Sequence, residues 1–580
     1  MKEFFLEGLN ENQKKVCLSH DNLLVTACPG SGKTRTLIHK IGYYLDNSPS
    51  IKKIIAITYT NRAADEIIDR LEILGVDYSR VWVGTIHQFC LEFIINRFRM
   101  YDSVLSRGYK IIDERVSNSY IDEIAKSMNV KLTFDNRPNL RYDRKFTPLE
   151  QNESFRDILA EYRKLLRQKH EIDFEMILLR SYKLLVDNSF ICELIKNSFE
   201  LICIDEYQDT QDLQYAIIEK IYNSNNNKLE INFFGDPNQS IYETLGGYAK
   251  SLKEINEEFY DNSFHNMVLN GCYRSPQNII DFYSNFMVEK YKIESVEEKE
   301  NGIIKYNTNT SVSDLYVKVA ECIKYCLKKG IKPSNICVLA PTWYLLFPFS
   351  RQLKSLLPNV PFDSSDITPI KKDPLNVFYN ISYLSLTKPT IKKISTRKRI
   401  SSDILNYLSQ YADINIEPID LLNFINSNNY TCEKGTEFVS YSILRVLNFL
   451  NIDLNSNQTL KEEYDNFIGK IFERLNNDKF QLTDELSDFK NMFMDKAGVV
   501  INTIHGVKGE EYDVVISFGL LKSKIPSMFT PFELKDNIAN RLLYVMASRC
   551  KKILIMISET GRKHYGKYDE PCPYLSDKFK

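Results

Sequence analysis

The sequence lacks any apolar run long enough to cross a membrane, and its first residues, Met1-Lys2-Glu3-Phe4-Phe5, lack a secretory signal pattern. We therefore predict a cytoplasmic protein without a membrane partner. An excess of either charge is also missing, since 75 basic residues stand against 76 acidic ones. That balance neither predicts nor excludes a nucleic-acid partner, because local patches rather than net charge contact phosphates.

Cys-x-x-Cys pairs are missing among the 12 cysteines, which lie mostly in apolar stretches. Cys322 and Cys326 are four residues apart on a predicted helix face, so we predict reduced core thiols and neither metal ligands nor disulfides. The chain of 580 residues is too long for one core, and its 43% apolar and 26% charged residues are typical of globular proteins. Several folded domains are therefore expected.

Two stretches combine an apolar strand with a polar end. The apolar run 201–204 leads to two adjacent carboxylates, Asp205 and Glu206. We place them at the carboxyl edge of a buried parallel strand, where α/β proteins bind ligands. Upstream, residues 23–26 are typical of a strand that enters a glycine-rich loop opening the next helix. The loop residues are Ala27, Cys28, Pro29, Gly30, Ser31, Gly32, Lys33 and Thr34, followed by Arg35.

Together the two stretches predict a nucleoside triphosphatase. Backbone N–H groups of the loop can bind phosphates, with Lys33 reaching the β- and γ-phosphates. The Thr34 hydroxyl and Asp205 are candidate Mg²⁺ ligands from opposite sides of the site. Each stretch alone has an ordinary explanation, because the standard loop has glycine where Ala27 stands and an Asp-Glu pair is commonly a helix N-terminus or a solvated turn. Their agreement on one sheet favours the nucleotide site.

Other strands show the same pattern. Residues 54–58 form one predicted strand and residues 81–89 form another with a polar exit. Residues 230–234 lead into a polar segment in which Gln239 is a candidate to sense a γ-phosphate or orient water. Upstream, the amide of Gln13 matches the paired donor and acceptor of an adenine edge, the alternative being an ordinary exposed glutamine.

Helical periodicity interrupts the α/β pattern twice. Residues from about 90 to 198 are predicted to form an inserted helical subdomain. Residues 363–495 are rich in Asn, Lys and Ile, with helical periodicity and no chemical motif. A second α/β region begins near Met267 and includes the apolar strand 336–340. Its strands resume at 499–502, 514–517 and 553–557.

Three basic clusters leave nucleic-acid contact open. For the first two, a solvated helix face or loop and contact with nucleic acid are equally favoured. For the third, a flexible solvated loop is favoured over phosphate contact. The clusters are Arg141 with Arg144 and Lys145; Arg163 with Lys164, Arg167 and Lys169; and the run 392–399.

The motifs form an ordered series from Gln13 to Arg549, and the chain resembles superfamily 1A helicases of the UvrD/Rep/PcrA type. The series is the Gln motif, the phosphate loop, Asp-Glu-Tyr-Gln-Asp-Thr, Gly-Asp-Pro-Asn-Gln-Ser-Ile-Tyr, Tyr-Arg-Ser, Lys-Gly-x-Glu and Arg-Leu-Leu-Tyr-Val-x-x-Ser-Arg. The resemblance implies an α/β fold of two RecA-like parallel-sheet domains with ATP in the cleft between them, each carrying a mainly helical insertion. The implied boundaries are 1–90 and 196–264 for domain 1A, 91–195 for insertion 1B, 265–362 and 496–580 for domain 2A, and 363–495 for a reduced insertion 2B.

The same resemblance implies roles at the ATP site. Glu206 looks like the residue that polarises the attacking water, with Asp205 and Thr34 serving Mg²⁺. Arg274 and Arg549 look like arginine fingers on the γ-phosphate. Tyr273 resembles an adenine-stacking tyrosine and Glu511 a ribose contact.

The resemblance also implies a DNA partner, with 3′-to-5′ translocation on single-stranded DNA. Aromatic rings can stack on any base, and hydroxyl or imidazole groups can reach phosphates. The positions that match residues lining the strand are Tyr59, Thr85, His87, Thr503 and His505.

The segment after Tyr242 departs from the family pattern. Where the family usually continues with aromatic-Arg-Gly-Ala, this chain has Glu243-Thr244-Leu245-Gly246-Gly247, so a stacking residue and its arginine are missing. Tyr248 is a candidate substitute. Glu510 stands where leucine is usual, and Ser548 replaces threonine but keeps the hydroxyl. These departures bear on strong DNA binding more than on ATP hydrolysis.

The reduced second insertion and the Asp-Glu-Tyr-Gln-Asp spelling also resemble the UvrD-like component of Gabija-type antiphage systems, which works beside an OLD-type (Toprim) nuclease. Three functions stay open: a duplex-unwinding translocase in antiviral defence, a stand-alone DNA repair helicase, and a DNA-stimulated, nucleotide-sensing regulatory ATPase of a nuclease complex. Thr244-Leu245 slightly favours the regulatory function, whereas the arginine pair favours real turnover. An RNA-directed motor is disfavoured, because nothing recognisably reads a 2′-hydroxyl.

Overall fold

The computed structural model describes residues 4–133, 136–225, 228–243, 246–260, 263–364, 368–371, 373, 376–390, 393–476, 482–493, 498–528, 530–564 and 566–579. The chain divides into two compact units, Met1–Tyr273 with Tyr291–Ile293, and Arg274–Lys290 with Glu294–Lys580. Each unit is built on a parallel sheet that has six strands within the described residues. The predicted α/β fold with two RecA-like sheets is therefore confirmed.

The sheet of the first unit has the strand order β3-β2-β6-β7-β1-β8, and every pairing is parallel. Parallel pairing brings the carboxyl ends of all strands to one edge, where ligands bind in such sheets. The strands are β1 (Leu23–Ala27), β2 (Lys53–Thr58), β3 (Val81–Thr85), β6 (Phe199–Asp205), β7 (Glu230–Gly235) and β8 (His265–Leu269).

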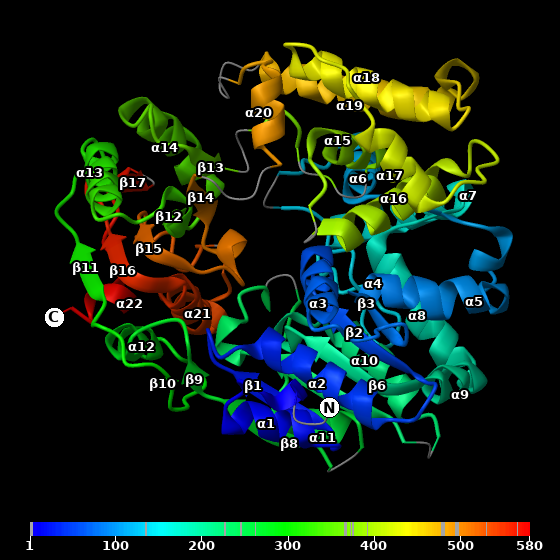
Figure 1. Ribbon diagram of the computed structural model, residues 1–580, viewed down its shortest axis with the longest axis horizontal. Coiled ribbons are helices and arrows are strands. Elements are labelled where there is room, and N and C mark those ends of the chain that lie inside the picture. The colour runs from blue at the N-terminus through cyan, green and yellow to red at the C-terminus, as the bar shows by residue number, and fades with distance from the viewer. Residues whose placement is uncertain are drawn as a thin grey trace. The chain divides into compact units, whose positions relative to one another are not determined.

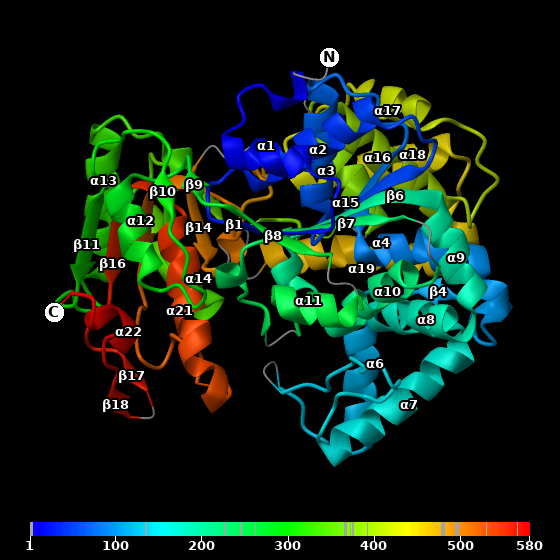
Figure 2. The same ribbon diagram turned by 90° about the horizontal axis from the view of Figure 1, so that it is seen from below.

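Helices cover both faces of this sheet, as Figure 2 shows. Alternate strand residues point to opposite faces, so Leu23 and Val25 pack in one core and Leu24 in the other. The first face is covered by α1 (Glu11–Leu18), α2 (Lys33–Asn47) and α3 (Asn61–Ile73), and the second by α8 (Phe174–Asp187), α9 (Ser189–Ser198), α10 (Asp212–Tyr222) and α11 (Leu252–Glu258).

The predicted first insertion is helical. Its chain passes through α4 (Ile86–Phe89), a π-helical turn at Cys90–Ile95 and α5 (Asn96–Phe98). A small separate core then joins α6 (Glu114–Ser127) to α7 (Glu153–Lys169), with Ile121 and Ile158 among its buried residues. Helices α8 and α9, by contrast, belong to the main core of the unit.

The predicted start of the second region at residue 265 is wrong. Strand β8 pairs with β1 in the first sheet, with Leu23 opposite His265 and Ala27 opposite Leu269. Its apolar end supplies Leu269 to the core beside β1, so the first unit continues to Tyr273. The four-part division of the chain otherwise stays a prediction.

The sheet of the second unit has the order β11-β16-β15-β12-β14-β13, again with parallel pairings throughout. Its strands are β11 (Ile303–Asn307), β12 (Ile336–Ala340), β13 (Phe362–Ser364), β14 (Val499–Thr503), β15 (Tyr512–Ser517) and β16 (Cys550–Ile557). Helices α13 (Leu315–Lys328) and α14 (Trp343–Leu356) pack on one face. Helices α12 (Gln277–Ser284) and α21 (Lys535–Ser548) contact each other through the rings of Tyr283 and Tyr544.

The second insertion is also helical and has a core of its own. Its described helices are α15 (Val377–Leu386), α16 (Ile394–Leu408), α17 (Pro418–Asn426), α18 (Gly435–Phe449), α19 (Gln458–Leu475) and α20 (Leu486–Asn491), labelled in Figure 1. The helical periodicity predicted for residues 363–495 is thus explained by the packing of these helices around a shared apolar core.

Ten of the 12 cysteines are buried, which confirms the prediction that most of them lie in the core. Within the described part of the chain, His, Cys, Asp and Glu form no group of three that could hold a metal ion. Among the same residues, no helix has the length and apolarity that a bilayer crossing requires.

Candidate functional site

The glycine-rich loop lies between β1 and α2 as predicted. Gly30 and Gly32 have φ of 76° and 74°, a left-handed backbone conformation that residues with a side chain rarely adopt. Gly32 caps α2, so the first-turn N–H groups of Lys33 and Thr34 face the loop. Among the described residues, the Ser31 hydroxyl is buried without a hydrogen-bond partner. A helix N-terminus, two left-handed glycines and an unused buried hydroxyl suit a phosphate group.

Asp205 and Glu206 end β6 at the carboxyl edge, as predicted. Lys33 Nζ donates to Asp205 Oδ1 and, at 2.6 Å, to Glu206 Oε1. Burial opposes the charge on Lys33, but the two carboxylates outweigh it and raise the pKa of the ammonium. Burial also raises the pKa of Asp205, against the pull of Lys33. Lys33, the predicted phosphate-binding residue, thus donates hydrogen bonds to both carboxylates in this structure.

Glu206 has a left-handed backbone, with φ of 56°, which is uncommon for a residue with a side chain. Its second carboxylate oxygen accepts a hydrogen bond from Gln208 Nε2. Sequence reasoning missed Gln208, although it is the fourth residue of the Asp-Glu-Tyr-Gln-Asp motif. The predicted sensor Gln239 follows β7, and its Nε2 donates to Asp236 Oδ2 at 2.8 Å.

The predicted base-binding residues lie beside the loop. Gln13 is fully buried, so the alternative of an exposed glutamine is wrong. Its amide accepts from Asn10 N at 2.9 Å and donates to Ser31 O at 2.8 Å, which fixes α1 against the loop. Tyr273 N donates to Gly30 O at 2.9 Å. Arg35 is exposed and approaches Gly8.

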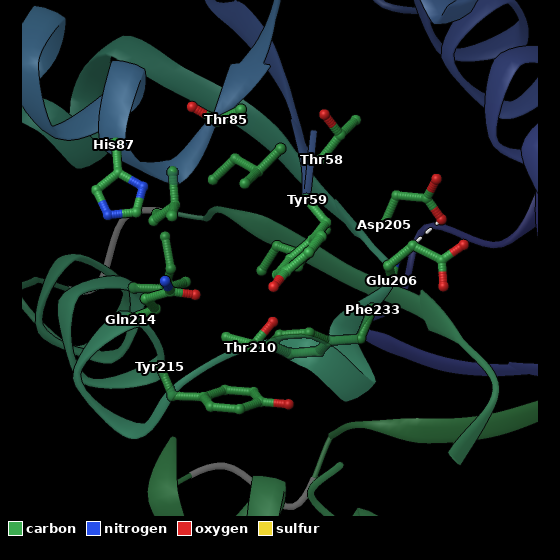
Figure 3. A pocket seen from close by; sticks show the side chains of 14 residues that line it. Thr58, Tyr59, Thr85, His87, Asp205, Glu206, Thr210, Gln214, Tyr215 and Phe233 are labelled. Carbon is green, nitrogen blue, oxygen red and sulfur yellow. Dashed lines mark hydrogen bonds between the residues drawn. The ribbon is translucent and has the colours of Figure 1, made fainter. Parts of the chain in front are cut away.

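Two tyrosines stack at the same edge of the sheet. The rings of Tyr59 and Tyr242 are 5.5 Å apart with an interplanar angle of 19°. Tyr59 is 45% exposed, and it lies near Thr85, His87 and the two carboxylates in Figure 3. The tyrosine pair therefore presents an aromatic surface beside the candidate catalytic groups.

Thr85 and His87 are less available for DNA than the sequence suggested. The Thr85 hydroxyl accepts from Gln88 N at 3.4 Å and caps α4. His87 packs edge-on against Phe174, with ring centroids 5.4 Å apart. Burial lowers the pKa of His87 to about 4, so the imidazole is neutral at physiological pH. Any contact it makes with a phosphate is that of a neutral donor.

The burial of His87 predicts a pH-dependent stability. The unfolded chain takes up this proton near pH 6.5, but the folded chain takes it up only near pH 4, so the free energy of unfolding falls as the pH drops between these values. Because the ring is partly exposed, we expect a loss of roughly 1 to 2 kcal/mol between pH 7 and pH 4.5. Urea denaturation of the wild type and of His87→Phe at both pH values measures it.

The exposed His265 on β8 supplies the control for that experiment. His265→Gln should keep the pH dependence of the wild type, whereas His87→Phe should reduce it. Equal pH dependence in the wild type and in His87→Phe would show that the buried imidazole is not responsible.

The two predicted arginine fingers, Arg274 and Arg549, donate hydrogen bonds to acceptors within the second unit. Arg274 Nε donates to Glu511 Oε2 at 2.8 Å, and its Nη1 donates to Ser548 O at 2.7 Å. Despite partial burial, Arg274 and Lys551 lower the pKa of Glu511 to about 2. Arg549 is 1% exposed, and its Nε donates to Val545 O at 3.0 Å. Glu511 and both arginines are therefore engaged within the unit.

The two predicted DNA contacts of this unit are Thr503, the last residue of β14, and His505, which follows the strand. Thr503 is buried, and its hydroxyl accepts from Gly506 N at 3.1 Å. Burial, with a smaller contribution from Lys508, lowers the pKa of His505. Their contact with DNA stays a prediction.

One arginine of each of the first two basic clusters makes a strong contact within the protein. Arg144 forms ion pairs with Asp212 at 2.6 Å and Glu258 at 2.7 Å. The guanidinium of Arg163 lies 4.1 Å from the ring centre of Tyr142. Their other members, Arg141, Lys145, Lys164, Arg167 and Lys169, stay candidates for nucleic-acid contact.

The favoured interpretation of 392–399 as a flexible solvated loop is wrong where the structure describes it. Lys392 lies outside the described residues, but residues 394–399 belong to α16. Arg397 is 2% exposed and donates to Leu384 O at 3.0 Å and Asn426 Oδ1 at 2.9 Å. This arginine joins helices of the insertion.

The departure after Tyr242 is only partly visible. Thr244 and Leu245 lie outside the described residues. The Tyr248 hydroxyl donates to Glu254, and Tyr248 N donates to Thr210 O at 3.1 Å. The proposed replacement of the missing aromatic residue by Tyr248 stays a prediction.

Two family profiles match the chain. The UvrD/REP helicase N-terminal domain matches residues 9–260, and the UvrD-like helicase C-terminal domain matches residues 380–561. Together they cover about three quarters of the chain.

Similar full-length relatives include a probable DNA helicase II homolog of Mycoplasma capricolum subsp. capricolum, 26% identical over 96% of this chain and 85% of the relative. The ATP-dependent DNA helicase PcrA of Bacillus subtilis is 24% identical over 97% and 84%, and PcrA of Staphylococcus epidermidis is 25% identical over 97% and 85%. With both profiles in order along the chain and a phosphate loop opposite an Asp-Glu strand end, the chain belongs to the UvrD-like superfamily 1A helicases.

Proposed function

We propose that the protein is an ATP-dependent DNA helicase. The observation that carries this proposal is the convergence of Lys33, Asp205 and Glu206 at the carboxyl edge of the first sheet, in a chain whose relatives are named DNA helicases. Lys33 binds the γ-phosphate end of the nucleotide, and Glu206 accepts a proton from the attacking water.

The residues present also fit Mg²⁺. The Thr34 hydroxyl and the Asp205 carboxylate are oxygen donors of the kind that Mg²⁺ prefers, and Mg²⁺ commonly takes only one or two carboxylates besides phosphates. A bound Mg²⁺ would neutralise charge on the β- and γ-phosphates. For Asp205 to bind Mg²⁺ while Lys33 binds phosphate, Lys33 must exchange its hydrogen bond to Asp205 for one to the phosphate.

Arg274 and Arg549 stabilise charge on the γ-phosphate, as the resemblance implies. To do so each must release the hydrogen bonds that it makes to Glu511, Ser548 or Val545. The two arginines then make different contacts in the nucleotide-bound and nucleotide-free states. Such a difference is required if ATP binding and hydrolysis are to change the conformation of the protein.

The experiment that tests the proposal is ATP hydrolysis with and without single-stranded DNA, followed by strand separation on tailed duplexes. Stimulation by DNA and unwinding of a 3′-tailed duplex, but not of a 5′-tailed one, support a 3′-to-5′ helicase. Hydrolysis that DNA does not stimulate would overturn the proposal.

DNA binding should depend on the tyrosine pair. Base-aromatic stacking contributes about 1 to 3 kcal/mol per base, so Tyr59→Ala and Tyr242→Ala should each weaken single-stranded DNA binding about 10-fold. Fluorescence anisotropy with labelled oligonucleotides measures this effect. Tyr260→Ala is the control, because Tyr260 is 85% exposed and comes before the amino end of the outer strand β8. The tyrosine pair, by contrast, follows the carboxyl ends of β2 and β7. Equal affinity in all variants would remove the pair from the DNA site.

A finer proposal concerns the biological setting. The reduced second insertion and the Asp-Glu-Tyr-Gln-Asp spelling favour work beside an OLD-type nuclease in antiphage defence. In the second candidate function, DNA-stimulated hydrolysis regulates that nuclease without productive unwinding. Stopped-flow strand separation by the isolated chain would reject this regulatory function, and recovery of a chain that acts alone in repair would reject the nuclease partnership.

A further inference from the structure

Gln208 has an unusual position beside the catalytic carboxylate. It is fully buried, and both ends of its amide are used. Nε2 donates to Glu206 Oε2, while Oε1 accepts from Asp236 N at 3.1 Å. A side-chain amide can donate to a carboxylate through its NH₂ group and accept from a backbone N–H through its oxygen at once.

The loop after β7 is shaped around this glutamine. A Cβ atom at Gly235 would lie 2.2 Å from Gln208 Oε1, which is closer than any side chain permits. Ser240 Oγ donates to Gln208 O at 3.1 Å, so both ends of the turn 235–240 contact the same residue. The position of Glu206 and the position of this turn are therefore linked.

The same turn leads to the surface proposed for DNA. Gln239 N donates to Asp236 O at 2.9 Å, which keeps the sensor residue in the turn. Tyr242 follows two residues after Ser240 and stacks on Tyr59. A base inserted at the tyrosine pair would displace Tyr242, and Ser240 and Asp236 would pass that displacement to Gln208.

We propose that Gln208 is a positioning residue that couples DNA at the tyrosine pair Tyr59–Tyr242 to the orientation of the catalytic carboxylate of Glu206. This inference rests on the proposed function and assigns to it the route of DNA stimulation. Lys33 holds Glu206 well enough for basal hydrolysis, whereas the stimulated rate requires Gln208.

The test compares basal and DNA-stimulated kcat, KM for ATP and Kd for single-stranded DNA in the wild type and in Gln208→Met. Methionine keeps the length of the side chain and removes both hydrogen bonds. We expect the ratio of stimulated to basal kcat to fall about 10-fold, with both binding constants near those of the wild type. An unchanged ratio overturns the proposal, as does an equal fall of both rates, which indicates a purely structural role.

A second variant guards against misfolding. Gln208→Leu also removes both hydrogen bonds while keeping an uncharged side chain in this fully buried position, so it should lose stimulation as well. Gln214→Met is the matched control, since it removes a largely buried glutamine from nearby α10 and should keep the wild-type ratio. Thermal unfolding shows which variants are folded.

A double-mutant cycle separates coupling from independent damage. If Gln208 and Tyr242 act on one route, Tyr242→Leu should reduce the ratio little further in a Gln208→Met background. Full additivity of the two effects overturns the route. A wild-type protein that hydrolyses ATP without stimulation by DNA would reject the proposed function itself, and that result needs no variant.

Discussion

Glu206→Gln is expected to lower DNA-stimulated ATP hydrolysis by about 10² to 10⁴-fold while leaving ATP binding intact, because general acid-base groups contribute about that factor. The amide cannot accept the proton of the attacking water. It keeps the shape of the carboxylate and an oxygen that can still accept from Lys33, now 2.6 Å from Glu206 Oε1. Steady-state hydrolysis and titration with a fluorescent ATP analogue measure the two quantities.

The control for this prediction lies on the same strand. Glu200 is near the amino end of β6 and pairs with Arg80 at 3.0 Å, far along the strand from the loop. Glu200→Gln makes the same chemical change there and should keep full hydrolysis. A Glu206→Gln protein that hydrolyses at the wild-type rate would remove Glu206 from the catalytic role. Loss of ATP binding in that variant would indicate that the carboxylate acts only in holding Lys33.

The strands and the loop were predictable because local chemistry determines them. Leu23 to Ala27 is buried along its whole length, so its apolar run is a reliable sign of a central parallel strand. Gly30 and Gly32 mark the backbone conformations that the loop requires. Asp205 is placed simply by being the last residue of such a strand.

Partners distant in sequence were not predictable. Gln208 contacts Asp236, 28 residues further on, and Arg274 pairs with Glu511, 237 residues further on. The buried Arg397 shows the same limit, since a run of basic residues predicts a solvated segment unless its tertiary acceptors are known. Strand β8 was misplaced because its pairing with β1 spans most of the first unit.

Arg274→Ala is the second change with a large expected effect. Arginine fingers contribute about 10³ to 10⁵ in rate in related nucleotide hydrolases, so we expect kcat to fall at least about 10³-fold. Affinity for single-stranded DNA should stay unchanged, because the residues proposed for DNA on the first unit are untouched. Hydrolysis at saturating DNA and anisotropy with labelled DNA measure the two effects.

Arg274→Lys distinguishes the planar guanidinium from simple charge. A guanidinium can bind a phosphate through two parallel N–H groups, a two-point geometry that an ammonium cannot reproduce. We therefore expect Arg274→Lys to resemble Arg274→Ala in kcat while preserving the charge. Arg351→Ala, which removes a partly exposed arginine on α14, is the control and should keep wild-type hydrolysis. Wild-type kcat in Arg274→Lys would show that positive charge suffices. Wild-type kcat in Arg274→Ala would show that Arg274 has no role in hydrolysis and acts only as the ion-pair partner of Glu511.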